Sequence, residues 1–504
     1  MSTRNSSFAR RKEWLRVYGA ALLTYLLATL FTQARFTGDA PDYVQSIVAY
    51  DRGQYYEFWE FGHLLWRPLG WLLFKVTEPL LLRLSGGDLE AAAATMLVTI
   101  SWVAGLISVL ALAAILRRLV TKEWVTQVTV PAFVCSYGFL NFAQTGTPYI
   151  TSLAFMLLAL WILVRRVPGD LSLTAAIAAG VLMGLMICCW LPFIVVVPAI
   201  VLAPTLLSRN ISSLRNSLIA GMVAAVLVGA LYLAVAGGPV GVRNVAGFRA
   251  WMQQTTGKTV QDKGLARTML GFPRSFIYMG NDGMLFKRYL VHDPFNPVTT
   301  FDLLRLSLWK IILFYLGLAA LVLNLFAART ARRLLALLVL TAVTVVGVAI
   351  YWQGGDIERY LPFYPILFMA IAGALANQQS KRLLNYVVLL FFLLAALVNF
   401  YAMSPPVVAA QQAKAADRIA ALMPQLTPNS HLFVVNFQDE VYSFTRDFPF
   451  HPLNRAHTLK VTSLIEVGGR DAQRWPQDFA THAESVWKEG GDVWMTRRVL
   501  SATP

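Results

Sequence analysis

Long apolar stretches separated by short basic loops dominate this chain. Predominantly apolar windows, each long enough to cross about 30 Å of hydrocarbon, lie at 14–34, 91–116, 124–143, 147–165, 171–189, 191–207, 216–236, 305–327, 334–352, 358–376 and 383–402. This pattern predicts an α-helical, multi-span membrane protein with about eleven transmembrane helices. The N-terminus has the charge layout of a signal sequence, but no small-x-small cleavage site follows it, so we expect an uncleaved first span.

One apolar segment, "HLLWRPLGWLLFKVTEPLLLRL" (63–84), contains several charged residues and two prolines. If it does not span, the cytoplasmic loops are the N-terminus, "RRLVTKE", "RRVPGD", "SRNISSLRN", "ARTARR" and "QQSKR", all of them basic. If it spans, most of these clusters face outward, against the positive-inside rule. The sequence therefore predicts interfacial helices at 63–84, with the N-terminus in the cytoplasm and the C-terminus outside.

This topology divides the chain into a transmembrane domain (1–403) and a small extracytoplasmic domain (404–504). The first outer loop covers 35–90 and the large outer loop 237–304. In the C-terminal domain the pattern predicts a helix at 406–422, strands at 431–437, 457–465 and 492–500, and a helix near 470–488. These elements indicate a small α/β domain, and the lack of a glycine-rich phosphate loop argues against nucleotide binding.

Composition agrees with a membrane protein and excludes other classes. Of 504 residues, 57% are hydrophobic and 14% charged, and the mean hydropathy is +0.56. The formal net charge of +16 comes from clusters at the ends of apolar runs, which indicates topology signals rather than nucleic-acid binding. The 3 cysteines lie inside apolar runs without C-x-x-C spacing, so neither a disulfide framework nor a zinc site is predicted.

The stretch "FTGDAPDYVQSI" (36–47) places Asp39 and Asp42 directly after the first apolar run. At a spacing of i, i+3 the two carboxylates share one helix face, where one could act as a general base and the other could orient it. The alternative is structural, because Asp39 could cap the helix, Pro41 suits its first turn and Asp42 favours the helix dipole.

The acidic residues after the first span, followed by the amphipathic segment "YVQSIVAYDRGQYYEFWEFGHLLWRPLG", resemble the first loop of GT-C glycosyltransferases. That superfamily includes the aminoarabinose transferases and protein O-mannosyltransferases. A second similar stretch is "GDIERYLPFYPILFMAIAGAL" (355–375), which resembles the Arg-Tyr-x-x-Pro start of a late span in the superfamily. The resemblance implies a bacterial cytoplasmic (inner) membrane enzyme with a catalytic Asp and a polyprenyl-phosphate sugar donor.

One departure from the family affects the catalytic assignment. Many aminoarabinose-type members have a second acid at the start of the fourth span, where this chain has "QTGTPYITS" (144–152). The catalytic candidates are therefore Asp39, with Asp42 as helper.

A lipid phosphate requires cations, and the large outer loop has a basic surplus on the side where positive loops are not expected. Its cations include Arg274, Lys287 and Arg288. The resemblance adds Arg359 and Tyr360. His63 and Arg67, spaced i, i+4 on the interfacial segment, complete the candidate donor-phosphate site. The alternatives are a loop that binds lipid head groups, pairing of Arg359 with Glu358, and a structural role for His63.

No cofactor is predicted. Asp39, Asp42, Glu57 and Glu60 are hard oxygen ligands suited to Mg²⁺ or Mn²⁺, but their spacing matches no metal signature. We interpret Gly180 and Gly184, spaced i, i+4, as a site of close helix packing.

We therefore predict a membrane glycosyltransferase that moves a sugar from polyprenyl phosphate to an extracytoplasmic glycan, lipid or protein, with inversion at the anomeric carbon. A transporter or lipid flippase of cell-envelope glycan assembly is the alternative. It is disfavoured because the spans are nearly free of charge and no half-to-half repeat is found. A non-catalytic scaffold is the third hypothesis.

Overall fold

The computed structural model describes residues 2–54, 58–165, 171–208, 212–256, 264–279, 289, 297–303, 307–327, 331–377, 382–425, 427, 429–435, 440–447, 460–464 and 475–500. The chain forms two compact units. The helical unit comprises Met1–Ala34, Asp42–Tyr278 and Leu313–Phe400, and the sheet unit comprises Arg35–Pro41, Met279–Ile312 and Tyr401–Pro504.

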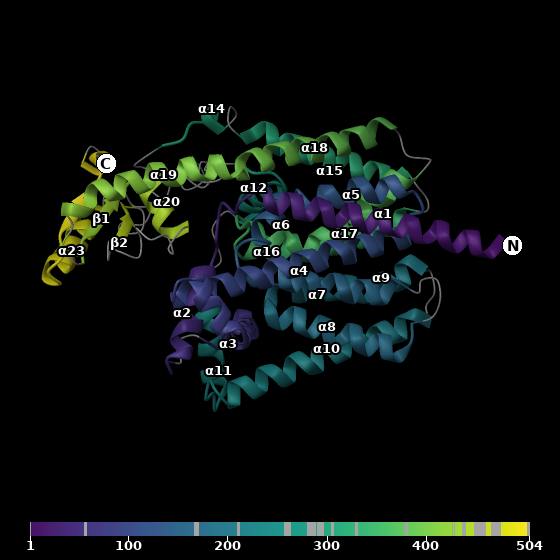
Figure 1. Ribbon diagram of the computed structural model, residues 1–504, viewed down its shortest axis with the longest axis horizontal. Coiled ribbons are helices and arrows are strands. Elements are labelled where there is room, and N and C mark those ends of the chain that lie inside the picture. Colours follow the sequence, from purple (N-terminus) through teal and green to yellow (C-terminus); the bar gives the residue numbers. More distant parts are fainter. Residues whose placement is uncertain are drawn as a thin grey trace. The chain divides into compact units, whose positions relative to one another are not determined.

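The helical unit is a bundle of apolar helices (Figure 1). Its bundle helices are α1 (Ser2–Leu30), α4 (Leu89–Leu119), α5 (Glu123–Val134), α6 (Tyr137–Phe142), α7 (Pro148–Val164), α8 (Leu173–Cys189), α9 (Val197–Ser208), α10 (Ser212–Gly237), α15 (Trp309–Ala327), α16 (Arg332–Tyr351), α17 (Tyr364–Ala376) and α18 (Arg382–Met403). Helices α4, α7, α8 and α10 pack one against the next in that order, and Figure 1 shows them side by side.

Seven of the described helices are long and apolar enough to cross a membrane. They are Leu89–Leu119, Leu191–Ser208, Ser213–Gly237, Trp309–Ala327, Arg332–Tyr351, Ile357–Ala376 and Arg382–Met403. Three shorter apolar helices, Leu15–Leu30, Pro148–Val164 and Leu173–Cys189, fall in other expected windows. These helices support an integral membrane protein, whereas the count of eleven spans and their orientation stay predictions.

The eleventh expected window, 124–143, is divided into α5 and α6 at Cys135–Ser136. Breaking a helix frees backbone groups that need partners within an apolar bundle. The side-chain amide of Asn399 in α18 supplies them, because its Nδ2 donates to the carbonyls of Cys135 and Phe276 at 2.8 Å each. Its Oδ1 accepts from the backbone N–H of Tyr278 at 2.7 Å. This buried amide therefore joins three segments that are far apart in sequence.

The glycines predicted to mediate close packing do so between α8 and α10. A Cβ on Gly180 would lie 2.6 Å from the Ala220 carbonyl oxygen, and one on Gly184 would lie 2.7 Å from a methyl carbon of Leu227. A side chain at Gly180 would overlap backbone, and one at Gly184 would require Leu227 to shift, so the interpretation of both glycines as a site of close helix packing is confirmed.

Further helices, most of them short, gather at one end of the helical unit. They are α2 (Ala40–Asp51), η1 (Phe61–His63), α3 (Trp66–Leu84), η2 (Leu191–Val196), α11 (Val245–Thr256), α12 (Gly264–Phe276) and η4 (Ile357–Phe363). Figure 1 shows α3 nearly end-on, while α4, α7 and α8 run across the picture. Helix α3 is not among the candidate spans, in agreement with the prediction that 63–84 does not cross the membrane; its interfacial position stays a prediction.

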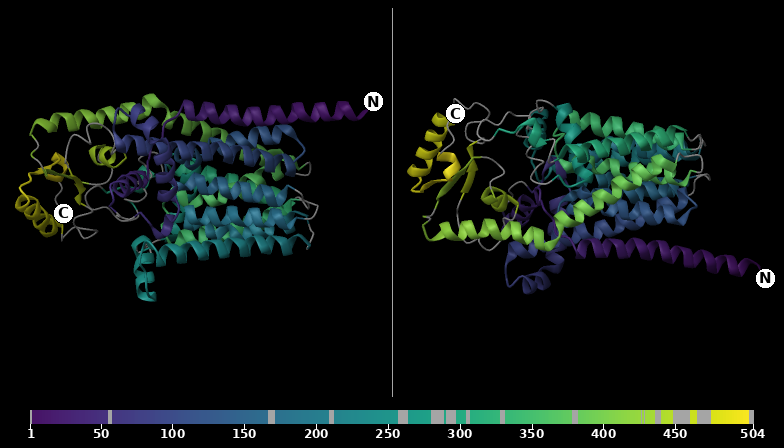
Figure 2. Two further views of the ribbon diagram at one scale, coloured as in Figure 1. Left: turned by 60° about the horizontal axis from the view of Figure 1, so that its bottom comes forward. Right: turned by 90° about the horizontal axis from the view of Figure 1, so that it is seen from above.

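The described part of the sheet unit contains a three-stranded parallel sheet in the order β2-β1-β3. The strands are β1 (His431–Val434), β2 (Lys460–Ser463) and β3 (Val493–Met495). The helices are α14 (Thr300–Leu303), α19 (Pro405–Leu422), α20 (Glu440–Asp447), α23 (Trp475–Lys488) and α24 (Arg497–Leu500), with the short turn η5 (Met423–Gln425). In Figure 2 (right), α23 and α19 lie on opposite sides of the strands.

Side-chain alternation along β1 explains this layering. Leu432 and Val434 belong to an apolar cluster with α19 and α20, whereas the Phe433 ring contacts Phe479 of α23 at 4.8 Å. Helix α19 and the strands follow the predicted α/β pattern, but the final strand, expected at 492–500, ends at Met495. Helix α24 takes the place of the second half of the expected strand, because a helical turn there buries Val499 against Val435 and Leu464.

Candidate functional site

Three 3₁₀ helices of the described chain, η1, η2 and η4, meet at one end of the helical unit. The end of α8 connects them. The carbonyl of Cys188 accepts from the backbone N–H of Leu65, just after η1, at 2.9 Å. Two residues later, the Trp190 ring lies 5.5 Å from the Arg359 guanidinium of η4. Charged side chains from the first outer loop and from the late span therefore lie around one structural junction.

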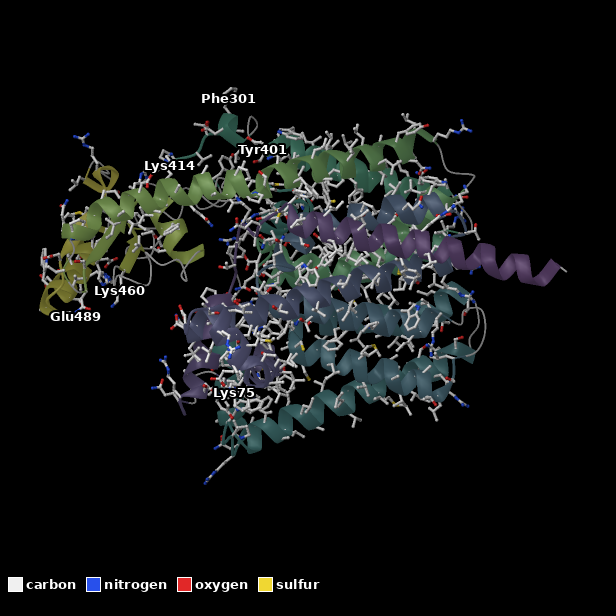
Figure 3. All side chains as sticks on the ribbon, in the orientation of Figure 1. Lys75, Phe301, Tyr401, Lys414, Lys460 and Glu489 are labelled. Carbon is white, nitrogen blue, oxygen red and sulfur yellow. The ribbon has the colours of Figure 1, made fainter. Side chains whose placement is uncertain are left out.

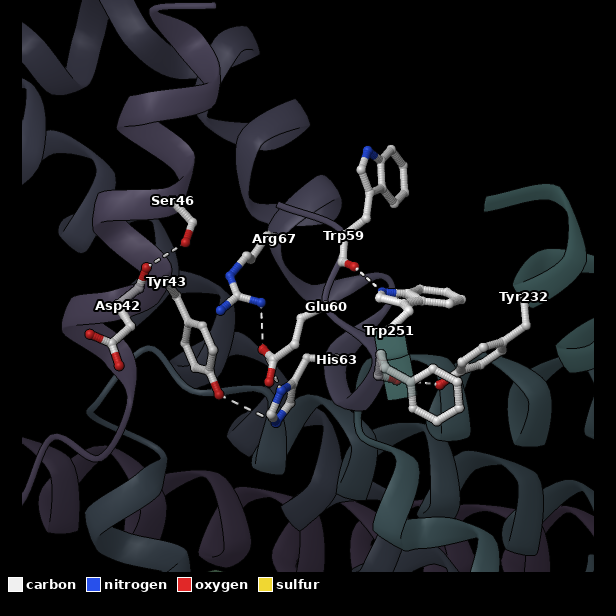
Figure 4. A network of polar contacts seen from close by, with 10 residues as sticks. Asp42, Tyr43, Ser46, Trp59, Glu60, His63, Arg67, Tyr232 and Trp251 are labelled. Carbon is white, nitrogen blue, oxygen red and sulfur yellow. Dashed lines mark hydrogen bonds and ion pairs between the residues drawn. The ribbon is translucent and has the colours of Figure 1, made fainter. Parts of the chain in front are cut away.

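Glu60, just before η1, holds two basic side chains together (Figure 4). Its Oε2 accepts hydrogen bonds from Nδ1 of His63 at 2.9 Å and from Nη1 of Arg67 at 2.5 Å. The side chains of Glu60, His63 and Arg67 are 22%, 10% and 3% exposed. Burial alone would raise the pKa of Glu60, but the charges and hydrogen bonds of His63 and Arg67 outweigh it and lower this pKa to about 2. Glu60 is therefore ionised at neutral pH, and its charge fixes both basic groups.

Tyr43 of α2 lies against the same cluster. Its hydroxyl is 3.3 Å from Nε2 of His63, and its ring lies 4.9 Å from the Arg67 guanidinium. A neutral His63 with its proton on Nδ1 accepts from this hydroxyl, and a protonated His63 donates to it. Nε of Arg67 is buried and has no hydrogen-bond partner among the described residues. The cluster carries no net charge with neutral His63 and one positive charge with protonated His63.

Arg359 forms a second cationic centre, between two tryptophans. Its guanidinium lies 4.0 Å from the Trp352 ring and 5.5 Å from the Trp190 ring. Its Nη2 donates to Oε1 of Gln353, so Gln353 rather than Glu358 is its observed partner. In the described part of the chain, Nε and Nη1 of Arg359 and Nε1 of Trp352 are buried without hydrogen-bond partners. A buried unpaired donor costs about 1–3 kcal/mol, and more when it is charged, so these three N–H groups favour an anion.

The turn that carries Gln353 is held tightly in place. Gln353 has a positive φ of 54°, which is uncommon for a residue with a side chain. The Tyr360 hydroxyl lies 2.5 Å from the Gly354 carbonyl oxygen, to which it donates, and 3.2 Å from that of Thr268. A Cβ on Gly271 of α12 would overlap the Gly354 carbonyl oxygen, so α12 packs directly on the turn. These contacts give Tyr360 a positioning role, and donor binding by Tyr360 stays a prediction.

The other predicted donor-binding cations are only partly described. Nη1 of Arg274, in the last turn of α12, donates to the Gly355 carbonyl at 3.4 Å, which places Arg274 beside the same turn. Lys287 and Arg288 lie outside the described residues, as does the candidate metal ligand Glu57. Among the described residues no group of three His, Cys, Asp or Glu side chains could hold a metal ion.

The two catalytic candidates lie at the start of α2, which begins at Ala40. Asp39 immediately precedes the helix, after Gly38 with its positive φ of 61°, and Asp42 lies in the first turn. Both are exposed. Asp42 directly precedes Tyr43, which reaches His63 (Figure 4). Asp39 therefore occupies the position of a helix cap and Asp42 lies in the first turn, while a catalytic role for either carboxylate stays a prediction.

Sequence reasoning missed the aromatic side chains of this site: Tyr43, Trp190, Tyr232, Trp251 and Trp352. Tryptophans and tyrosines at span ends are ordinary membrane-interface anchors, so their type and position do not indicate which of them contacts a charged group. The available signal was the "WQGG" turn at the end of an apolar window, where two glycines suggest close backbone approach.

Comparison with known proteins yields distant structural neighbours. No family model and no curated protein matches the chain. It is similar to the crystal structure of ArnT from Cupriavidus metallidurans bound to undecaprenyl phosphate, at 14% identity and a TM-score of 0.49, covering 96% of this chain and 89% of that one. It is also similar to the oligosaccharyltransferase of Archaeoglobus fulgidus in its apo form, at 14% identity and a TM-score of 0.43, with 86% and 63% covered.

A third neighbour is the archaeal oligosaccharyltransferase AglB from Archaeoglobus fulgidus, in complex with an inhibitory peptide and a dolichol-phosphate. The identity is 14% and the TM-score 0.42, with 87% of this chain and 64% of that chain covered. This chain thus spans less than two thirds of the archaeal enzyme. Both ArnT and AglB are thus similar to this chain over most of its length, at low identity.

Proposed function

We propose that this protein is a membrane glycosyltransferase that takes a sugar from a polyprenyl-phosphate donor and transfers it to an extracytoplasmic glycan, lipid or protein. The observation that carries the proposal is the Arg359 centre. Three buried N–H groups of Arg359 and Trp352 have no partner among the described residues, in a chain whose helices are long and apolar enough to span a membrane.

A phosphate monoanion or diester oxygen suits this centre. The guanidinium has two nitrogens, Nε and Nη1, that can still donate to phosphate oxygens, and charge-assisted hydrogen bonds are shorter and stronger than neutral ones. The two tryptophan rings surround the cation with apolar surface and limit its hydration, so an incoming anion meets a weakly solvated charge.

Arg67 and His63 supply further N–H groups at the same junction. Glu60 offsets one positive charge and fixes the geometry of both groups. With His63 protonated the cluster carries one positive charge, which suits such an enzyme because the leaving lipid phosphate carries more negative charge after the glycosidic bond breaks.

The proposed chemistry is a single displacement. A carboxylate, Asp39 with Asp42 as helper, removes the proton of the acceptor hydroxyl or amine as its lone pair forms the bond to the anomeric carbon. The bond from that carbon to the phosphate oxygen breaks, and its electron pair leaves with polyprenyl phosphate. Configuration at the anomeric carbon is inverted.

The proposal is tested with purified full-length protein in detergent, a labelled polyprenyl phosphate and a panel of polyprenyl-phosphate sugars. Arg359→Gln is expected to weaken binding of the lipid phosphate about 10- to 100-fold, the equivalent of one strong charge-assisted interaction. Arg332→Gln is the matched control, because Arg332 lies at the other end of α16, over the Phe326 ring, and donates to a carbonyl. Its binding should equal that of the wild type.

Two further variants test which carboxylate acts as the catalytic base. Asp39→Asn and Asp42→Asn keep the side-chain shape, so loss of turnover with donor still bound identifies the base. Equal binding by Arg359→Gln and wild type, or a product of retained configuration, would contradict the proposal.

A further inference from the structure

The turn that carries Glu60 is held from both sides by two aromatic donors. The carbonyl of Trp59, immediately before Glu60, accepts from Nε1 of Trp251 at 2.8 Å. The carbonyl of Phe61, immediately after it, accepts from the Tyr232 hydroxyl at 2.6 Å. Figure 4 shows both donors on the side of Glu60 opposite Tyr43. With both neighbouring carbonyls fixed, the backbone of Glu60 has little freedom to move.

Packing reinforces these hydrogen bonds. The Phe61 ring meets the edges of three rings, those of Tyr232, Trp251 and Phe248, at centroid distances of 4.9, 5.1 and 5.7 Å. Phe61, Tyr232 and Trp251 are buried in one apolar cluster with the end of α8. Edge-to-face contacts of this kind are directional, so the cluster fixes the orientation of the turn as well as its depth.

The donors come from α10 and α11, which join at an ordered bend (Figure 2, left). The backbone N–H of Val242 donates to the Ala236 carbonyl at 2.7 Å, and Gly241 has a positive φ of 72°. Oδ1 of Asn244 then accepts from the backbone N–H of Gly247 at 2.7 Å and caps the start of α11. The position of Trp251 is therefore set by the bend between these helices.

We propose that Tyr232 and Trp251 are positioning residues that couple the large outer loop to the donor-phosphate site. Trp251 of α11, the first element of that loop, holds the Trp59 carbonyl, and Tyr232 of the adjoining α10 holds the Phe61 carbonyl. Together they fix Glu60, and Glu60 fixes His63 and Arg67. The kinetic part of this inference rests on the proposed function. The structural part, ordering of the 58–66 segment by the two donors, does not depend on it.

The first test compares Tyr232→Phe with Tyr25→Phe in the purified full-length protein. The Tyr25 hydroxyl donates to the Trp102 carbonyl at 2.7 Å, so both variants remove one buried hydroxyl-to-carbonyl bond, but only Tyr232 lies at the site. Tyr232→Phe is expected to lower kcat/KM for the sugar donor about 5- to 10-fold, the equivalent of one hydrogen bond. Tyr25→Phe should leave kcat/KM within about twofold of wild type.

A double mutant distinguishes a positioning role of Tyr232 from a general loss of stability. If Tyr232 acts through Glu60, adding Tyr232→Phe to Glu60→Gln causes no further loss of kcat/KM. Fully additive losses, or equal losses in Tyr232→Phe and Tyr25→Phe, would overturn the proposal.

Hydrogen–deuterium exchange measures the ordering of the 58–66 segment without requiring sugar transfer. In Tyr232→Phe and Trp251→Phe, amides in the 58–66 segment should exchange at least about tenfold faster than in Tyr25→Phe. If the wild type transfers no sugar but this acceleration is seen, the proposed function fails and the ordering role stands. If exchange in 58–66 is unchanged, the positioning role is refuted whether or not the enzyme is active.

Discussion

The ion cluster around Glu60 makes a quantitative prediction for Glu60→Gln. The substitution keeps the shape and one acceptor oxygen but removes the charge that His63 and Arg67 share. The pKa of Glu60 is lowered from 4.5 to about 2, which corresponds to about 3 kcal/mol of differential interaction. Removing one partner of a fully buried pair costs about 3–5 kcal/mol, and of an exposed pair about 0–1. With Glu60 22% exposed, we expect a loss of about 2–3 kcal/mol.

The lowered pKa of Glu60 determines how the stability difference between wild type and Glu60→Gln changes with pH. A carboxyl whose pKa is lowered in the folded state stabilises that state fully above its unfolded pKa, and the contribution is lost as pH falls through the folded value. The wild type should therefore be more stable than Glu60→Gln at pH 7. The difference should shrink as pH falls from about 4.5 toward about 2, where the Glu60 carboxyl becomes protonated.

Thermal unfolding of both full-length proteins in detergent, at several pH values between 3 and 7, measures this difference. Lys75→Met is a useful comparison, because Lys75 (labelled in Figure 3) pairs with Asp51 and Glu78 but its side chain is 37% exposed, so the loss should be smaller. Equal Tm values for wild type and Glu60→Gln at pH 7, or a difference that does not change with pH, would refute the reasoning.

Two further predictions concern other parts of the chain. Gly271→Ala should destabilise the helical unit strongly and lower the yield of folded protein, because the added Cβ would overlap the Gly354 carbonyl oxygen. Gly347→Ala should be tolerated, because no atom lies within 4 Å of the added carbon. Equal melting curves for the two variants would contradict this prediction. Burial, with neighbouring charges that include His482, lowers the pKa of His431, so the sheet unit should lose stability as pH falls from 7.5 to 5. Limited proteolysis should show this loss for wild type and much less of it for His431→Gln, and identical pH profiles would rule it out.

The helical unit was largely predictable, because hydropathy and loop charge depend on local sequence alone. The windows from 14–34 to 383–402 fall on described helices, with 124–143 divided between α5 and α6, and helix α3, within the segment 63–84, is not among the candidate spans. The end of the last strand at Met495 was not recognised, since only the packed core shows that Val499 is buried by a helical turn.

The candidate site was predictable only in part. Glu60, His63 and Arg67 are spaced i, i+3 and i, i+7, a helical spacing that could have suggested their cluster, but Glu60 was considered only as a metal ligand. The contacts of Arg359 with Trp190, and of Tyr232 with Phe61, join positions far apart in the chain. Local patterns contain no information on such contacts, and the proposed functions of Arg359 and Tyr232 depend on them.

The most direct test of the proposed function offers the protein one sugar on two different carriers. Purified wild-type protein is given the same labelled sugar either as a polyprenyl-phosphate ester or as a nucleoside diphosphate sugar, with membrane extract as acceptor, and Arg359→Gln is run in parallel. We expect transfer from the polyprenyl phosphate alone and loss of this transfer in Arg359→Gln. Transfer from the nucleotide sugar, or transfer that does not depend on Arg359, would contradict the proposed function.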